Sequence, residues 1–298
     1  MPILRQSISP LRFNVLSFDQ LFVYHMTRQQ LIEQILKKRS YLCVGLDSDV
    51  EKLPSHFSKD ASGVLDFNRS IIDATRSLCV AYKINTAFYE SLGHRGWAAM
   101  EQTVDYIGQQ HFLIADAKRG DIGNTADQYA KAFFQATSFD AITVAPYMGA
   151  DSVLPFLKHP GKWAIVLGLT SNAGAADFEL QPCGQQMLYE KVMQTAASWG
   201  NPENLMFVVG ATQASVMGEI RKNYPDHFFL VPGVGAQGGS LEEVSKRALT
   251  SEAGLLINVS RAIIFASGKE DFAERAAAEA LQYQQQMAVL LNELVPQF

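Results

Sequence analysis

The charged residues best suited to chemistry lie in one short segment, residues 116–121, which reads D-A-K-R-G-D. Asp116 and Lys118 stand two residues apart at the end of an apolar run, and side chains at positions i and i+2 of a strand point to the same face. Lys83 ends the preceding apolar run, and Asp121 follows Lys118 closely. We expect these four residues to form an array of alternating charge, and the alternative is a set of structural salt bridges.

Such an array favours one kind of reaction. A lysine held between carboxylates keeps its proton, because opposite charge favours the ammonium form. It is then a poor Schiff-base nucleophile but a well-placed proton donor. A fixed carboxylate would repel an anionic group on a substrate and tolerate its departure as a neutral gas. The pattern therefore indicates loss of CO2 with protonation of the resulting carbanion, and it suits aldol chemistry through an amine less well.

A glycine-rich segment at residues 232–240, P-G-V-G-A-Q-G-G-S, is the second candidate site. It formally matches G-x-G-x-x-G, the dinucleotide-binding motif. That motif follows the first strand of its domain and precedes an acidic residue by about 20 positions. This copy instead comes late in the chain and is followed by Asn258. We expect a phosphate site instead, because glycines let backbone N–H groups approach an anion at a helix N-terminus. Arg261 would bind the same phosphate through two hydrogen bonds. The alternative is a plain glycine-rich turn with an exposed arginine.

Eight short apolar runs must position these residues. They are nearly continuous in hydrophobicity, which is typical of parallel strands buried on both faces. Amphipathic stretches lie between them, and capping boxes are predicted from Thr27 to Gln30 and from Ser240 to Glu243. Eight strand–helix units predict a single-domain (β/α)8 barrel, with the chemistry at the carboxyl ends of the strands, and an open doubly wound sheet is the alternative. The runs are residues 41–47, 80–85, 112–118, 140–146, 163–170, 205–212, 228–235 and 254–261.

Composition narrows the class of protein. The 298 residues are 48% hydrophobic and 18% charged, as in a globular protein, and the net charge of −5 argues against binding to nucleic acid or to an anionic membrane surface. No apolar run approaches the ~18 residues of a membrane span. Three cysteines without a C-x-x-C pair predict a reducing, cytoplasmic location. Six scattered histidines without H-x-H or H-E-x-x-H disfavour a tight metal site.

These motifs resemble those of the orotidine 5′-phosphate decarboxylase family, which makes UMP in pyrimidine synthesis, and look most like its bacterial type 2 subfamily. The resemblance covers roughly residues 26–266. We therefore expect a barrel domain over residues 26–298, and we interpret residues 1–25 as an overlong start of the reading frame in preference to an extension with its own role. The matching motifs are C-V-G-L-D at 43–47, Y-K-I-N at 82–85, D-A-K-R-G-D-I-G-N-T at 116–125, T-S-N at 170–172, P-G-V-G-A-Q at 232–237 and V-S-R at 259–261.

The resemblance implies a role for each matching residue in the chemistry of orotidine 5′-phosphate. Asp47 and Lys83 would bind the ribose, and Lys83 would also orient the charged network. Asp116 would lie against the substrate carboxylate, and Lys118 would donate the proton to C6. No metal or organic cofactor is implied.

The resemblance also implies a homodimer with a shared active site. Asp121, Ile122 and Thr125 would reach the partner's substrate, and Ser171 would contact the pyrimidine edge. Ser260 stands where many relatives have glycine, and T-S-N-A-G is a looser match to the family loop. The residues implied at the 5′-phosphate are Pro232, Gly233, Gly235, Gln237, Ser260 and Arg261.

Two other functions remain open at this point. Related phosphate-binding barrels use a similar D-x-K-x-x-D for Mg²⁺-dependent sugar-phosphate decarboxylation or aldol addition, and they commonly carry a Glu as metal ligand just before it. Here Leu113, Ile114 and Ala115 occupy those positions. A catalytically silent, nucleotide-binding barrel would be expected to lack at least one of the four charged residues, and all four are present.

Overall fold

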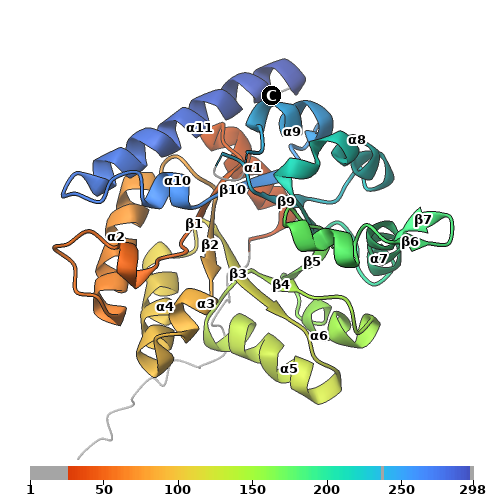
Figure 1. The fold of residues 1–298 in the computed structure, drawn as a ribbon, viewed down its shortest axis with the longest axis horizontal. Helices are drawn as coiled ribbons and strands as arrows, with labels where there is room; N and C mark the ends of the chain where they lie inside the picture. Colours follow the sequence, from red (N-terminus) through yellow and green to blue (C-terminus); the bar gives the residue numbers. More distant parts are fainter. Residues whose placement is uncertain (1–25, 236–237, 296–298) are drawn as a thin grey trace, which may run out of the picture.

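Eight strands pair in parallel and close into a barrel in the order β1–β10–β9–β8–β5–β4–β3–β2. The computed structural model describes residues 26–235 and 238–295, and Figure 1 shows the helices arranged around the strands. No strand extends more than one residue beyond its predicted run, so the predicted (β/α)8 barrel is confirmed and the open-sheet alternative is wrong. The strands are β1 (Leu42–Gly45), β2 (Ala81–Asn85), β3 (Phe112–Arg119), β4 (Ala141–Val144), β5 (Trp163–Leu169), β8 (Leu205–Val209), β9 (Phe229–Pro232) and β10 (Leu255–Val259).

Helices connect successive strands and cover the outside of the barrel (Figure 1). The last and longest, α11, runs across α2 and α9. Away from the barrel, β6 (Pro182–Cys183) and β7 (Gln186–Met187) form a small antiparallel hairpin beside α7. The α-helices are α1 (Arg28–Lys38), α2 (Ala61–Thr75), α3 (Ala87–Glu90), α4 (Gly93–Ile107), α5 (Gly123–Lys131), α6 (Leu154–Leu157), α7 (Leu188–Ala197), α8 (Ala214–Asn223), α9 (Leu241–Ala248), α10 (Arg261–Ile264) and α11 (Phe272–Leu294).

Two helices begin where the sequence predicts. Thr27 Oγ1 accepts a hydrogen bond from the Gln30 N–H, and the Thr27 N–H donates to Gln30 Oε1, so the capping box before α1 is confirmed. Ser240 Oγ accepts from the Glu243 N–H at 3.2 Å and caps α9, the helix that follows the glycine-rich segment. The predicted capping box is only half formed here, because the Glu243 side chain does not bond back to the Ser240 N–H. Residues 1–25, which we interpret as an overlong start, lie outside the described residues.

The barrel is buried on both faces, as the continuous apolar runs predict. Every residue of β1, β4, β8 and β10 is buried. Large side chains such as Tyr82, Trp163 and Phe207 fill the space inside the helical ring without exposure to solvent. This packing fixes the strands, so side chains at their carboxyl ends are held on a rigid frame.

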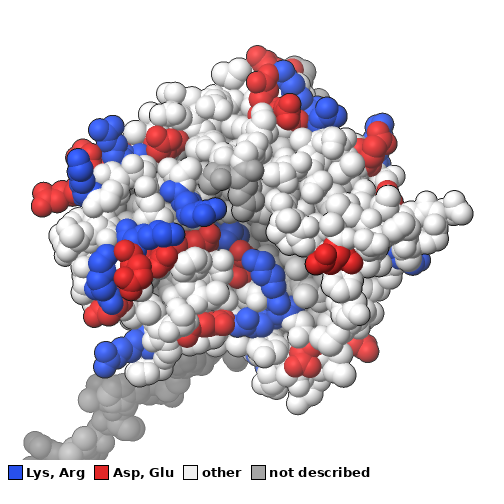
Figure 2. Space-filling view, in the orientation of Figure 1, with Lys and Arg blue, Asp and Glu red and all other residues white. Residues whose placement is uncertain are grey.

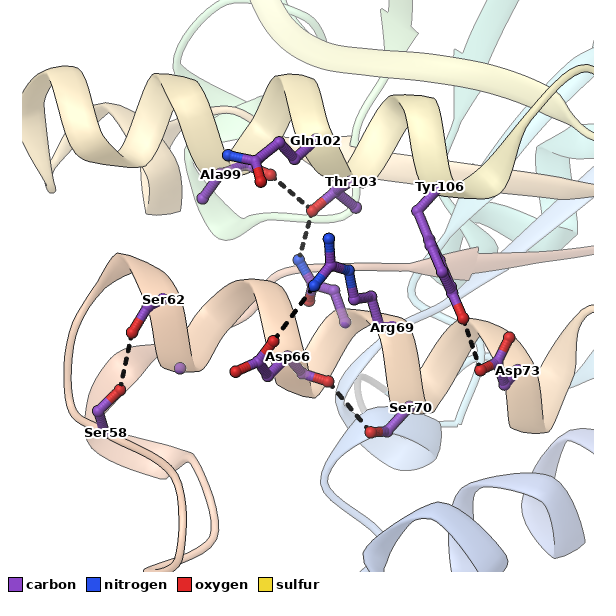
Figure 3. A network of polar contacts seen from close by, with 12 residues as sticks. Ser58, Ser62, Asp66, Arg69, Ser70, Asp73, Ala99, Gln102, Thr103 and Tyr106 are labelled. Atoms are coloured by element: carbon purple, nitrogen blue, oxygen red, sulfur yellow. Dashed lines mark hydrogen bonds and ion pairs between the residues drawn. The ribbon is translucent and has the colours of Figure 1, made fainter.

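Several polar side chains on the helices around the barrel are hydrogen-bonded to one another. In the contact between α2 and α4, Tyr106 reaches across to donate to Asp73, and Thr103 donates to the carbonyl oxygen of Ala99 (Figure 3). Asn68 is fully buried in α2; its Nδ2 donates to Thr103 and its Oδ1 accepts from Ser48. Such pairing is what burial of an amide requires.

Among the described residues, no helix combines the length and apolar character needed to cross a membrane.

Candidate active site

A cavity of about 310 Å³ opens at the carboxyl ends of the strands, and residues from all eight barrel strands or the loops that follow them line it. On this face, Lys and Arg side chains lie close to a central hollow with acidic side chains beside them (Figure 2). The location agrees with the rule for (β/α)8 barrels. Nine predicted site residues line the cavity: Asp47, Lys83, Asp116, Lys118, Ser171, Pro232, Gly233, Ser260 and Arg261.

Lys83 is the buried centre of the charged cluster. Its Nζ donates to Asp116 Oδ2 at 2.7 Å and to Asp47 Oδ1 at 3.2 Å, and only 4% of the side chain is exposed. Burial alone would lower the pKa of Lys83, but the carboxylates of Asp116 and Asp47 outweigh it and raise that pKa above its ordinary value. Lys83 therefore remains an ammonium ion that fixes two carboxylates.

Lys118 approaches the same carboxylate from the open side. Its Nζ lies 2.5 Å from Asp116 Oδ1, and 48% of its side chain is exposed. Burial alone would raise the pKa of Asp116, yet the ammonium groups of Lys83 and Lys118 hold it well below its usual range. Asp116 is therefore an ionised carboxylate between two cations, and of the two lysines Lys118 is the one that a bound molecule can reach.

The backbone is irregular at Lys118. Its φ of 45° lies in the left-handed region, which non-glycine residues adopt only when the surrounding structure imposes it. The pairing register between β3 and β4 shifts between Ala115 and Arg119. Thr143 of β4 fills the gap: its Oγ1 accepts from the Lys118 N–H at 2.9 Å and donates to Asp116 Oδ1 at 3.1 Å. One hydroxyl thus fixes both the backbone of Lys118 and the carboxylate of Asp116.

The cluster differs in one member from the predicted array. Asp121 does not line the cavity, and its Oδ1 accepts from the adjacent Ile122 N–H at 2.7 Å. Within one chain Asp47 takes the fourth place, because β1 lies beside β2 and brings that carboxylate to Lys83. Ile122, with 55% of its surface exposed, and Thr125, also exposed, lie outside the cavity too.

The predicted phosphate residues converge at the opposite side of the cavity. Pro232 ends β9 and Gly233 follows it, and Ser260 and Arg261 follow β10, the neighbouring strand. Ser260 Oγ donates to the carbonyl oxygen of Gly45 at 3.0 Å. In the described part of the chain, the Arg261 guanidinium makes no ion pair, so it can bind an anion.

Gly235 and Gln237 were also predicted at the phosphate, but neither is among the described residues that line the cavity. Gly235 has a φ of 75° and is not part of the lining; a Cβ there would lie 2.6 Å from the Tyr283 hydroxyl oxygen. Gln237 lies outside the described residues.

The loop after β5 forms a third side of the cavity. Ser171 lines the cavity as predicted, with Thr170 and Asn172 beside it. Glu179 anchors this loop by accepting from the Thr170 N–H at 2.7 Å and from its hydroxyl at 2.8 Å. Ser171 Oγ is buried and has no hydrogen-bond partner in the described residues.

Three polar residues near the site were not predicted: Thr143, Glu179 and Asn258. A lone polar residue inside an apolar strand, as in A-I-T-V-A-P and L-I-N-V-S-R, is the signal that could have found Thr143 and Asn258. In the part of the chain that the structure describes, no three His, Cys, Asp or Glu side chains are grouped so as to hold a metal ion.

Residues 40–276 match the model of the "Orotidine 5'-phosphate decarboxylase / HUMPS family". This chain belongs to that family. A curated orotidine 5′-phosphate decarboxylase from Christiangramia forsetii is 56% identical over 272 residues, which cover 90% of this chain and all of that protein. One from Phocaeicola vulgatus is 54% identical over 89% of this chain and 99% of its own length.

Solved structures of the family have the same fold. The OMP decarboxylase of Leishmania donovani superimposes with a TM-score of 0.75 at 36% identity, over 87% of this chain and 99% of that one. The family and the fold predicted from the sequence are thereby confirmed.

Proposed function

We propose that this chain converts orotidine 5′-phosphate to UMP and CO2. The family, and the shared name of relatives that match along nearly their whole length, support a carboxy-lyase with this substrate. The single observation that carries the proposal is the position of Asp116, an ionised carboxylate between Lys83 and Lys118 in the cavity.

Asp116 and Lys118 would carry out the chemical step. The substrate carboxylate would lie against Asp116, and repulsion between the two anions would be relieved as the bond to C6 breaks and CO2 leaves. The electron pair stays on C6 and takes a proton from the Lys118 ammonium. Lys118 suits this role better than Lys83, which is buried and donates to two carboxylates.

The remaining lining would hold the nucleotide in place. Asp47 and Lys83 would bind the ribose, and Ser171 would contact the pyrimidine edge. Binding of a phosphate far from the reacting carbon supplies free energy that can be used at the transition state. The 5′-phosphate would be held by Arg261 and the backbone and side chains of Pro232, Gly233, Gly235, Gln237 and Ser260.

A homodimer would complete the site. Asp121, Ile122 and Thr125 lie outside the cavity of their own chain, and Ile122 and Thr125 are exposed, as expected for residues that reach a partner's substrate. A cytoplasmic location follows from the biosynthetic role and agrees with the free thiols of Cys43, Cys79 and Cys183.

The experiment that tests the reaction is the ultraviolet absorbance of orotidine 5′-phosphate mixed with the purified protein and EDTA. Loss of the orotate band with UMP as the product is the expected result. Activity that returns only after Mg²⁺ is added would instead favour the metal-dependent sugar-phosphate relatives. No turnover with folded protein present would favour a silent nucleotide-binding barrel.

A further inference from the structure

Asn258 is a buried amide on the inner side of β10 that no role described so far uses. It lines the cavity and is only 7% exposed. The other strand residues on the floor nearby, Leu167, Val208 and Leu230, are apolar. Asn258 therefore places a polar group in an apolar part of the floor, apart from the cluster of Lys83, Asp116 and Thr143.

The amide oxygen of Asn258 is left without a partner. Its Oδ1 is buried and accepts no hydrogen bond from any described residue. Asn68, the other buried asparagine among the described residues, is different, since Ser48, Tyr89 and Thr103 all hydrogen-bond to it. An unpaired buried amide destabilises a fold. Since Oδ1 itself is buried, a bound molecule would meet the part of the Asn258 amide that lines the cavity.

The surrounding backbone is shaped to admit this side chain. Gly45 of β1 faces Asn258, and a Cβ there would lie 3.0 Å from Asn258 Oδ1 and 2.7 Å from Ser260 Cβ. Asn258 and Ser260 are two residues apart and share a face of β10. Asn258 therefore lies next to the predicted phosphate contact, one step deeper in the barrel.

We propose that Asn258 is a further substrate-binding residue that hydrogen-bonds a hydroxyl group of the ribose. The inference rests on the proposed function. The ribose is the group bonded to the 5′-phosphate, so a residue adjacent to the phosphate site on the same strand face meets the sugar. A hydroxyl both donates and accepts, and can pair with either end of an amide.

Binding of three product-like nucleotides to the wild type and an Asn258→Ala variant tests this role. Calorimetry with UMP, 2′-deoxy-UMP and 3′-deoxy-UMP shows whether the loss depends on one hydroxyl. We expect Asn258→Ala to weaken UMP binding about three- to tenfold. The deoxynucleotide that lacks the hydroxyl bound by Asn258 should keep nearly the same affinity, because it cannot form that hydrogen bond in either protein. Val208→Ala, on the same floor, is the control and should affect all three ligands alike.

Thermal unfolding without nucleotide separates binding from a structural role. Because the Asn258 amide is unpaired in the described chain, Asn258→Ala should lower Tm no more than Val208→Ala does. A larger drop in Tm, an equal loss for all three nucleotides, or no loss for UMP would overturn the assignment. Absence of UMP binding by the wild type would overturn the proposed function as well, which distinguishes the two failures.

Discussion

Asp116 Oδ2 accepts a hydrogen bond of 2.7 Å from Lys83 Nζ, across the pairing of β2 with β3. Two buried groups of opposite charge hold each other ionised here, since the pKa of Asp116 is lowered and that of Lys83 is raised. The second oxygen of Asp116 faces Lys118 at 2.5 Å. A fixed negative charge is thus placed beside the accessible ammonium group.

An Asp116→Asn variant should separate binding from chemistry. Removing the negative charge removes the repulsion of the substrate carboxylate, so we expect kcat to fall by about a hundredfold or more while orotidine 5′-phosphate binds more tightly. The measurement is kcat together with the Kd of the substrate, and UMP, which lacks the carboxylate, is the control ligand. If Asp116→Asn bound orotidine 5′-phosphate no more tightly than the wild type does, relative to UMP, this role for Asp116 would be contradicted.

An Arg261→Ala variant should lose recognition of the phosphate. A hydrogen bond to a charged group contributes about 1.5–3 kcal/mol, so kcat/KM for orotidine 5′-phosphate should fall about ten- to a hundredfold. Orotidine without the phosphate should react equally with both proteins. Arg275→Ala, in the exposed ion pair of α11 with Asp271, is the matched control. Equal losses with and without the phosphate would place the phosphate elsewhere.

A shared active site predicts complementation between two inactive variants. In a mixed dimer of Lys118→Ala and Asp121→Ala chains, one site contains an intact Lys118 from one chain and an intact Asp121 from the other. We expect mixing the variants to restore part of the activity that each lacks alone. Sedimentation of the wild type should show a dimer. A monomer, or mixtures as inactive as the separate variants, would contradict a site completed by Asp121 of a partner.

His111 should make the protein sensitive to acid. Burial, and then the nearby Lys38 ammonium, lower the pKa of His111 to about 4 from the ordinary 6.5. The unfolded chain takes up a proton first as the pH falls below 6.5, so this histidine should reduce the free energy of unfolding by about 3 kcal/mol between pH 7 and pH 4. Urea unfolding at several pH values should show a flatter profile for His111→Gln than for the wild type.

The exposed His94 of α4 provides the control for that experiment. His94→Gln should keep the pH profile of the wild type, because His94 lies exposed on the surface. An unchanged profile in His111→Gln would mean that other groups account for the acid sensitivity.

Strand positions and the charged motif could be predicted because they depend on local pattern. Eight buried parallel strands are recognisable as continuous apolar runs, and the barrel then places their carboxyl ends together. The spacing of Asp116 and Lys118 likewise anticipated their contact. These features are set by a few neighbouring residues.

The rest depends on contacts between distant parts of the chain. The irregular backbone of Lys118 leaves a gap in the β3–β4 pairing that Thr143 fills, and a strand pattern carries no sign of such a shift. Asp47, and not Asp121, reaches Lys83 because β1 lies beside β2. The position of the Asn258 side chain depends on the absence of a Cβ at Gly45, which would lie 3.0 Å from Asn258 Oδ1. Each of these is a tertiary relationship that appears only when the barrel closes.

Turnover by a Lys118→Ala variant tests the proposed proton donor most directly. Loss of a general acid costs about 10²- to 10⁴-fold in rate, so we expect kcat for orotidine 5′-phosphate to fall by at least about a hundredfold. Affinity for UMP should change only several-fold, because Lys83 and Arg261 remain. Lys158→Ala, on the exposed surface beside Asp127, should behave as the wild type. A Lys118→Ala variant with kcat within about tenfold of the wild type would contradict the assignment.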